Sequence, residues 1–304
     1  MVGCDIIRPK KRKVSVSTMA MDDGRQMRAF YAVVFAVVVF SCAELPAQEE
    51  NVESSPVGMY GWVNPEIESA HISIGRLKVS YPVFNLDVGA GLDFRDYGYT
   101  AVGVWSESDL CSHYRRQRHQ AFQEVDPIVL YGYRFNIAEG WSLDSRLGHQ
   151  WNFMAGYRGD ANRSYDEWQF KETLETPWLT LWYGMRNFYL PVTKASFVVG
   201  ALKSFKLTDD WSLTPAFWMD GGSARWNSQR FGYTQDASRI GRGLNSCSAR
   251  LTLSWLMTDK VSFYCSLTGY AAIDSDVREE LDENPSREAK KHYAVVATGI
   301  KIGL

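Results

Sequence analysis

The stretch WSLDSRLGHQWNFMAGY, residues 141–157, decides the fold of this chain. Its odd positions are mostly apolar, as Leu143 and Leu147 are, and its even positions are mostly polar, as Asp144 and Arg146 are. Successive side chains of a β-strand point to opposite faces, so the alternation predicts one long strand with an apolar and a polar face. The fold then depends on the surroundings that each face meets.

The same pattern recurs on both sides of tight acidic turns. FNIAEGWSLDSRL, FKLTDDWSLTPAF and LMTDKVSFYCSL each contain a strand end, a turn at 138–140, 208–210 or 258–260, and a new alternating strand. Such segments are typical of β-hairpins. Because the strands follow one another closely in sequence, we expect an antiparallel meander.

Extended along the chain, the alternation predicts about twelve strands, an even number as in single-chain bacterial barrels. We place them at residues 69–77, 83–94, 98–106, 127–137, 141–157, 165–174, 178–187, 194–207, 211–221, 244–257, 261–273 and 292–304. Short turns follow Phe94, Ile137, Thr173, Leu207 and Met257. Longer polar loops occupy 106–126, 158–164, 222–243 and 274–291, the last with a short helix from Val277 to Leu281.

Strand length and loop asymmetry predict the fold class: all-β, an antiparallel up-and-down transmembrane β-barrel with short periplasmic turns and long extracellular loops. A soluble β-sandwich is the alternative, but sandwich strands are about 5 to 6 residues long and several strands here are longer. Aromatic residues near the strand ends are expected at the two membrane interfaces. These are Trp105, Trp141, Trp178, Trp211, Trp226 and Tyr270.

The N-terminal region predicts export to the bacterial outer membrane. Residues 1–47 read as an extended basic n-region and a cleaved signal peptide, with an apolar run at 29–40 that is short for a membrane span. Cleavage after Ala43 or after Ala47 and a start at Met1, Met21 or Met27 stay open, as does a lipoprotein anchor at Cys42. Residues 48–68 are expected to form a short periplasmic segment before a barrel of residues 69–304.

Composition excludes several function classes. The chain has 304 residues and a formal net charge of -2, so it lacks the basic surface of a nucleic-acid-binding protein. Cys111, Cys247 and Cys265 have no CxxC spacing and no histidine pattern beside them, so we expect no metal site and no cofactor.

A resemblance to a known family follows from four segments. YPVFNLDVGAGLDFRDYGYTAVGVW, EVDPIVLYGYRF, GWSLDSRLGHQW and LKSFKLTDDWSLTP resemble the TorF porin family over most of residues 69–304. This resemblance implies an outer-membrane barrel with pore activity and no catalytic residues. The C-terminal HYAVVATGIKIGL is similar to the closing strand by which the barrel assembly machinery recognises its substrates, with Leu304 in place of the usual Phe.

The polar parity of the strands predicts the residues that line the lumen. The candidates carry both signs of charge: Asp87, Asp93, Asp126, Arg134, Asp144, Arg146, Gln150, Lys206 and Arg250. They suit a narrow porin for passive diffusion of ions or small polar solutes, in which a mixed-charge constriction orders the solute. The alternative is that these side chains pair with one another and plug the barrel.

Two further functions remain open. The loop residues Arg115, Arg116 and Arg118 could bind lipopolysaccharide phosphates or acidic solutes, and long extracellular loops also suit a non-conducting structural or adhesion barrel. An outer-membrane lipid hydrolase would need a serine with a base in reach. His149 lies on the apolar parity without a matching serine, so we predict no enzymatic activity. The sequence does not predict the oligomeric state.

Overall fold

The computed structural model describes residues 57–73, 76–79, 81–110, 124–153, 165–188, 194–231, 240–283 and 290–304. The chain divides into two compact units, residues 1–40 and 41–304, and every described residue belongs to the second. The expected signal peptide and the basic loop of Arg115, Arg116 and Arg118 lie outside the described residues. Their roles therefore stay predictions.

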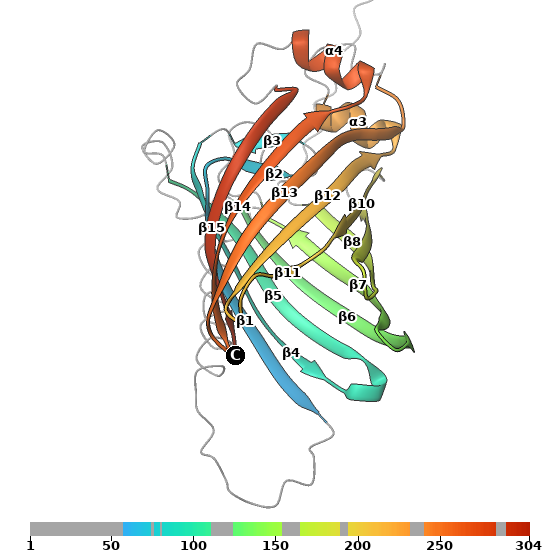
Figure 1. Cartoon of the computed structure of the whole chain (residues 1–304). Coiled ribbons are helices and arrows are strands. Elements are labelled where there is room, and N and C mark those ends of the chain that lie inside the picture. The colour runs from blue at the N-terminus through green and yellow to red at the C-terminus, as the bar shows by residue number, and fades with distance from the viewer. Residues whose placement is uncertain are drawn as a thin grey trace, which may run out of the picture. The chain divides into compact units, whose positions relative to one another are not determined.

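Twelve strands form a closed antiparallel barrel, as the sequence predicts (Figure 1). They are β1 (Gly58–Glu68), β4 (Val83–Asp93), β5 (Tyr99–Asp109), β6 (Glu124–Ala138), β7 (Trp141–Asn152), β8 (Tyr165–Glu175), β9 (Thr180–Phe188), β10 (Lys194–Leu202), β12 (Trp211–Gly222), β13 (Gly243–Thr258), β14 (Val261–Ala272) and β15 (His292–Gly303). Each strand pairs with the next in this order, and β15 pairs with β1 to close the ring. Closure leaves no strand of the ring at an open edge.

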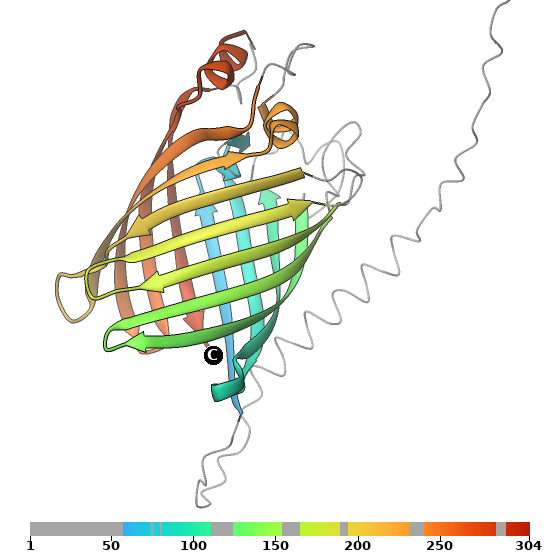
Figure 2. The ribbon, with the colours of Figure 1, turned by 90° about the vertical axis from the view of Figure 1, so that its right-hand side faces the viewer.

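The connections alternate in length, which gives the barrel two different ends (Figure 2). The short-turn end carries the 3-10 helix η1 (Arg95–Tyr97), the small strand β11 (Phe205–Lys206) and the C-terminus. The long-loop end carries the hairpin of β2 (His71–Ser73) and β3 (Arg76–Val79) and the helices α3 (Ala224–Phe231) and α4 (Ser275–Glu283). In the part of the chain that the structure describes, neither helix is long and apolar enough to cross a membrane.

The two loop helices begin at residues that suit a helix N-terminus. The Ser223 hydroxyl accepts a hydrogen bond from the backbone N–H of Trp226 at 3.3 Å, and the Asp274 carboxylate accepts one from Val277 at 2.9 Å. Serine and aspartate are favoured there because they satisfy backbone donors that the helix leaves unpaired. The short helix expected near Val277 is confirmed as α4, whereas α3 lies where the sequence predicted only a loop.

Side-chain alternation separates an apolar outer face from a polar inner face. The outer positions near mid-strand hold exposed aliphatic and aromatic side chains on nearly every strand: Val102, Val129, Tyr131, Leu147, Trp168, Met185, Val199, Phe217, Leu251, Leu267 and Val296. The opening stretch forms β7, which ends at Asn152, and Phe153 continues the pairing with Val125 through an isolated bridge. The apolar side chains of β7 face outward and its polar side chains face the lumen.

The first strand begins earlier than the sequence predicts. Residues 69–77 were expected to start the barrel, but the first strand is β1, so residues 58–68 are not a separate periplasmic segment. The segment GMYGWVNPEIE contains Gly58, Gly61 and Pro65, which are depleted in strands. Its pairing with β15 skips the positions of Asn64 and Pro65, whereas its pairing with β4 is continuous.

The predicted aromatic girdles are partly wrong. Trp178 and Trp211 are exposed near the short-turn end, where a girdle was expected. Trp226 instead lies buried in α3, stacked on Phe188 with ring centroids 4.6 Å apart, and Tyr270 is buried inside the barrel. Sequence position near a strand end does not distinguish an outward aromatic residue from one that packs under a loop.

Candidate solute pathway in the barrel lumen

The lumen holds a cavity of about 750 Å³ toward the short-turn end. Its wall is formed by β1, β4, β5, β6 and β7 and by the turn that contains η1. Five of the residues that the sequence predicted to line a pore lie on this wall: Asp87, Asp93, Arg134, Asp144 and Arg146. The inner parity of adjacent strands therefore brings together residues that are far apart in the sequence.

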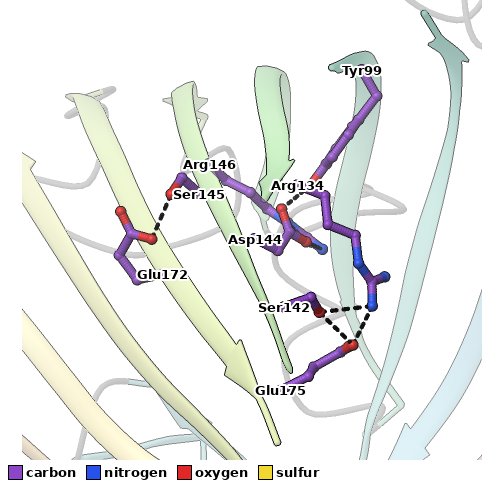
Figure 3. A network of polar contacts seen from close by, with 8 residues as sticks. All are labelled: Tyr99, Arg134, Ser142, Asp144, Ser145, Arg146, Glu172 and Glu175. Atoms are coloured by element: carbon purple, nitrogen blue, oxygen red, sulfur yellow. Dashed lines mark hydrogen bonds and ion pairs between the residues drawn. The ribbon is translucent and has the colours of Figure 1, made fainter. Parts of the chain in front are cut away.

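One polar network is centred on Asp144 (Figure 3). The Tyr99 hydroxyl donates a hydrogen bond to Oδ1 of Asp144 at 2.7 Å, and Nε of Arg146 donates one to Oδ2 at 3.0 Å. The Arg146 guanidinium also lies 5.6 Å from the centre of the Tyr99 ring, within the range of a cation–π contact. This carboxylate is thus held by neighbours on β5 and on its own strand β7.

A second network joins Arg134, Ser142 and Glu175 on β6, β7 and β8 (Figure 3). Arg134 forms an ion pair with Glu175 and donates to the Ser142 hydroxyl at 2.9 Å, and this hydroxyl in turn donates to Glu175 at 3.1 Å. On the outer parity of the same strands, Ser145 donates to Glu172 at 2.6 Å. Strands β7 and β8 therefore carry polar contacts on both faces near the short-turn end.

These charge pairs run along the barrel wall. Arg146 pairs with Asp144 on one strand, and Arg134 with Glu175 two strands away. Both pairs lie on the wall beside the cavity.

Asp126 and Gln150 belong to a different network, at the long-loop end. Nε2 of Gln150 donates to Oδ2 of Asp126 at 2.9 Å, and Gln169 donates to both Gln150 and Glu167 at 2.5 Å. Glu167 is fully buried and also pairs with Arg186 at 3.3 Å. The sequence prediction missed Gln169, Glu167 and Arg186, although the alternation of β8 and β9 places them on the inner parity.

The last two predicted candidates lie away from the cavity. Arg250 donates to the Thr268 hydroxyl at 2.9 Å and lies 5.3 Å from the Trp218 ring, on the wall formed by β12 to β14. Lys206 lies in β11 within the turn after β10, is 69% exposed and pairs with Asp209 at 2.8 Å. Its prediction as a pore-lining residue disagrees with this position, because β10 ends at Leu202 and the parity was extended past the strand end.

The aromatic side chains of β1 are the main feature that the sequence prediction missed. Trp62 Nε1 donates to Oδ1 of Asp87 at 2.8 Å, and Asn64 donates to Oδ2 at 3.3 Å. The Trp62 ring lies over Gly89 of β4 and the Tyr60 ring over Gly91, because a Cβ at either glycine would meet the ring at 2.3 to 2.4 Å. Glycine leaves the space that lets these rings lie flat on the wall.

His149, the candidate base on the outer face, packs between two tryptophan rings. The His149 ring lies between Trp151 and Trp168, with centroid distances of 4.4 Å and 4.8 Å. This is an aromatic packing site on the apolar parity of β7. Among the described residues, no group of three or more His, Cys, Asp or Glu side chains is arranged to hold a metal ion.

The chain is similar to several proteins of known structure. No family model and no curated protein matches the chain. An outer membrane channel from Pseudomonas putida F1 is 11% identical with a TM-score of 0.48, covering 84% of this chain and 99% of that one. The KdgM porin is 6% identical (TM-score 0.45, 80% and 98% covered), and the NanC porin 9% identical (TM-score 0.45, 80% and 100% covered). The fold assignment rests on the strand pairing above, and the resemblance to the TorF family stays a prediction.

Proposed function

We propose that the chain forms a bacterial outer-membrane porin through which ions and small polar solutes diffuse passively. The observation that carries the proposal is the charged cavity in the lumen of a closed barrel whose outer face is apolar. A water-facing interior and a lipid-facing exterior are the two properties that a membrane pore needs. The cavity of about 750 Å³ beside the charge pairs supports an open rather than a plugged interior.

The membrane location is supported by backbone chemistry as well as by the outer side chains. In hydrocarbon each backbone N–H and C=O must find a partner within the protein, which a closed ring provides. The strands of the ring are 9 to 16 residues long. A tilted membrane strand needs about 9 to 11 residues, so each strand is long enough to cross.

The proposed selectivity follows from the size of the barrel and the charges of the cavity. Twelve strands enclose a narrower lumen than the 16 to 18 strands of large porins, which restricts passage to small solutes. The cavity is lined by Asp87, Asp93 and Asp144 and by Arg95, Arg134 and Arg146. Three charges of each sign favour weak selectivity between anions and cations.

The remaining parts of the proposal concern regions outside the described residues or partners of the barrel. We expect export by the N-terminal signal peptide, contact with outer-membrane lipid, insertion by the barrel assembly machinery and attraction of lipopolysaccharide phosphates to Arg115, Arg116 and Arg118. These proposals follow from sequence pattern and charge.

Conductance of the purified barrel in planar bilayers tests the function. We expect stepwise KCl conductance and swelling of loaded liposomes in arabinose. Arg146→Ala removes a positive charge from the cavity wall, so the reversal potential in a KCl gradient should shift toward cation preference. Lys206→Ala is the matched control, because it removes the same charge in an exposed turn and should cause no shift. A folded barrel, shown by heat-modifiable gel mobility, that neither conducts nor admits arabinose would contradict the proposal.

A further inference from the structure

Two aromatic rings of β1 form a flat surface inside the cavity. The ring centroids of Tyr60 and Trp62 are 6.3 Å apart and their planes differ by 20°, so the two ring planes are nearly parallel. Each ring has one face against the backbone of β4, over Gly91 or Gly89, and both residues line the cavity. Both rings therefore offer apolar surface to the cavity, and we call this pair of rings the Tyr60–Trp62 platform.

Hydrogen-bonding groups border this platform. The Asp87 carboxylate accepts one bond from Trp62 and one from Asn64, each on a different oxygen. A carboxylate oxygen has two lone pairs, so each can also accept a bond from a ligand hydroxyl. Arg146 lines the same cavity with its side chain 40% exposed, and a guanidinium has five donors, of which Nε and Nη2 contact Asp144.

An apolar plate with donors and acceptors around its edge fits one class of solute. A saccharide ring has one face of C–H groups, which packs on an aromatic ring, and hydroxyls at its rim, which both donate and accept. The polar groups of the wall supply both partners, a carboxylate to accept and a guanidinium to donate. Pockets with apolar lining and a few placed polar groups give orientation and specificity in this way.

The charge of the cavity further restricts the solute. Arg146 is paired with Asp144, and Asp87 is held by the neutral side chains of Trp62 and Asn64. A strongly anionic ligand would face Asp87 without a compensating cation in contact with it. A simple cation would not use the rings' broad surface next to Arg146.

We propose that the Tyr60–Trp62 platform is a binding site for a neutral saccharide on its way through the lumen. The inference rests on the proposed porin function, since it names the solute class of the same pathway. We expect the site to bind the sugar weakly and reversibly. When no sugar is present, loss of the platform should leave the ion conductance of the barrel unchanged.

Titration of the full-length barrel with maltotriose tests the inference. In planar bilayers, maltotriose should reduce the KCl current in a saturable manner, and in detergent it should change tryptophan fluorescence. Trp62→Ala should weaken binding about tenfold, the size expected for the loss of one stacked ring. Tyr60→Ala should act in the same direction, and it serves as the second variant if Trp62→Ala does not fold.

Trp182→Ala is the matched control. The Trp182 ring of β9 also lies over a glycine, Gly200 of β10, but it does not line the cavity. Its loss should change maltotriose affinity less than twofold. The inference is overturned if maltotriose does not bind, if Trp62→Ala and Trp182→Ala weaken binding equally, or if trigalacturonate binds more tightly than maltotriose. A barrel that conducts KCl but does not bind refutes only the inference, whereas one that binds maltotriose without conducting refutes only the porin.

Discussion

Replacing Leu267 by arginine tests directly whether lipid covers the outer face. Leu267 lies on the outer parity of β14, six residues beyond Val261, where the strand begins, and its side chain is 53% exposed. At about 3.4 Å per residue and a tilt of about 40°, this position lies about 15 Å from the short-turn end along the membrane normal. That distance is near the middle of an apolar band about 25 Å tall. Its neighbours across the strands are Leu251 and Val296, which are also apolar and exposed.

The expected cost of Leu267→Arg depends on the surrounding medium. An arginine at the midplane of a bilayer costs a barrel about 2 to 4 kcal/mol, whereas a substitution on a water-exposed surface costs within about 0.5 kcal/mol. Met257 is the matched control, because it is 50% exposed but lies next to the turn, where the cost falls to about 0 to 1 kcal/mol. Equilibrium unfolding by guanidinium from phospholipid vesicles, followed by tryptophan fluorescence, measures both variants. Equal costs for the two positions would refute the lipid-facing assignment.

Three other substitutions test the interior. Glu175→Gln removes the negative partner of Arg134, so the reversal potential of the pore should shift toward anion preference, a result that an unshifted potential would contradict. Tyr264→Phe removes the hydroxyl that donates to Glu66 at 2.6 Å, and the free energy of unfolding should fall by about 1 to 2 kcal/mol in the same vesicle assay; an unchanged value would mean that water replaces the bond. Asn227→Ala removes three hydrogen bonds at the long-loop end, so amide exchange in α3 should accelerate while exchange in the barrel strands stays slow; uniform acceleration would contradict a local role.

Much of the fold could be predicted because its strands alternate between apolar and polar side chains. This alternation is expected of a barrel whose outer face meets lipid and whose inner face meets water. A strand of period two keeps one parity toward the lumen over its whole length, so the sequence alone predicts the faces of the polar residues of β7 and of the apolar residues of β13. The tight turns around 138–140, 208–210 and 258–260 then fix which strands are neighbours. These two signals place eleven of the twelve strands of the ring, all except β1, in their order and orientation.

The strand β1 was not predicted from the sequence, and the reason is physical. Its inner parity carries Tyr60 and Trp62 and its outer parity carries Pro65, so neither parity has a simple polar or apolar character. The rings are inside because Gly89 and Gly91 on the next strand make room for them, and this contact becomes visible only when the register of β1 against β4 is known. Missing this strand also removed the aromatic half of the candidate site from the prediction.

The sequence predicted which charged residues of the candidate site point into the lumen, but it did not predict where they lie along the lumen or what they contact. Parity placed Arg134, Asp144 and Arg146 inside the barrel, but not the depth of each along the lumen or its partner. Depth along one strand follows from residue number, as for Asp144 near the short turn of β7 and Gln150 toward its long-loop end, but depth relative to other strands depends on the stagger between strands. Lys206 shows the same limitation, because parity has no meaning once the strand has ended.

The join between β15 and β1 has a consequence for how this architecture relates to chain order. Trp62 pairs with Gly303, and the backbone N–H of Leu304 donates to the carbonyl oxygen of Gly61 at 3.0 Å, so backbone hydrogen bonds close the seam between the two ends of the chain's barrel. The closed ring of strands therefore does not depend on which strand comes first in the sequence. We therefore expect circularly permuted versions of this protein, which begin at another hairpin, to form the same closed barrel.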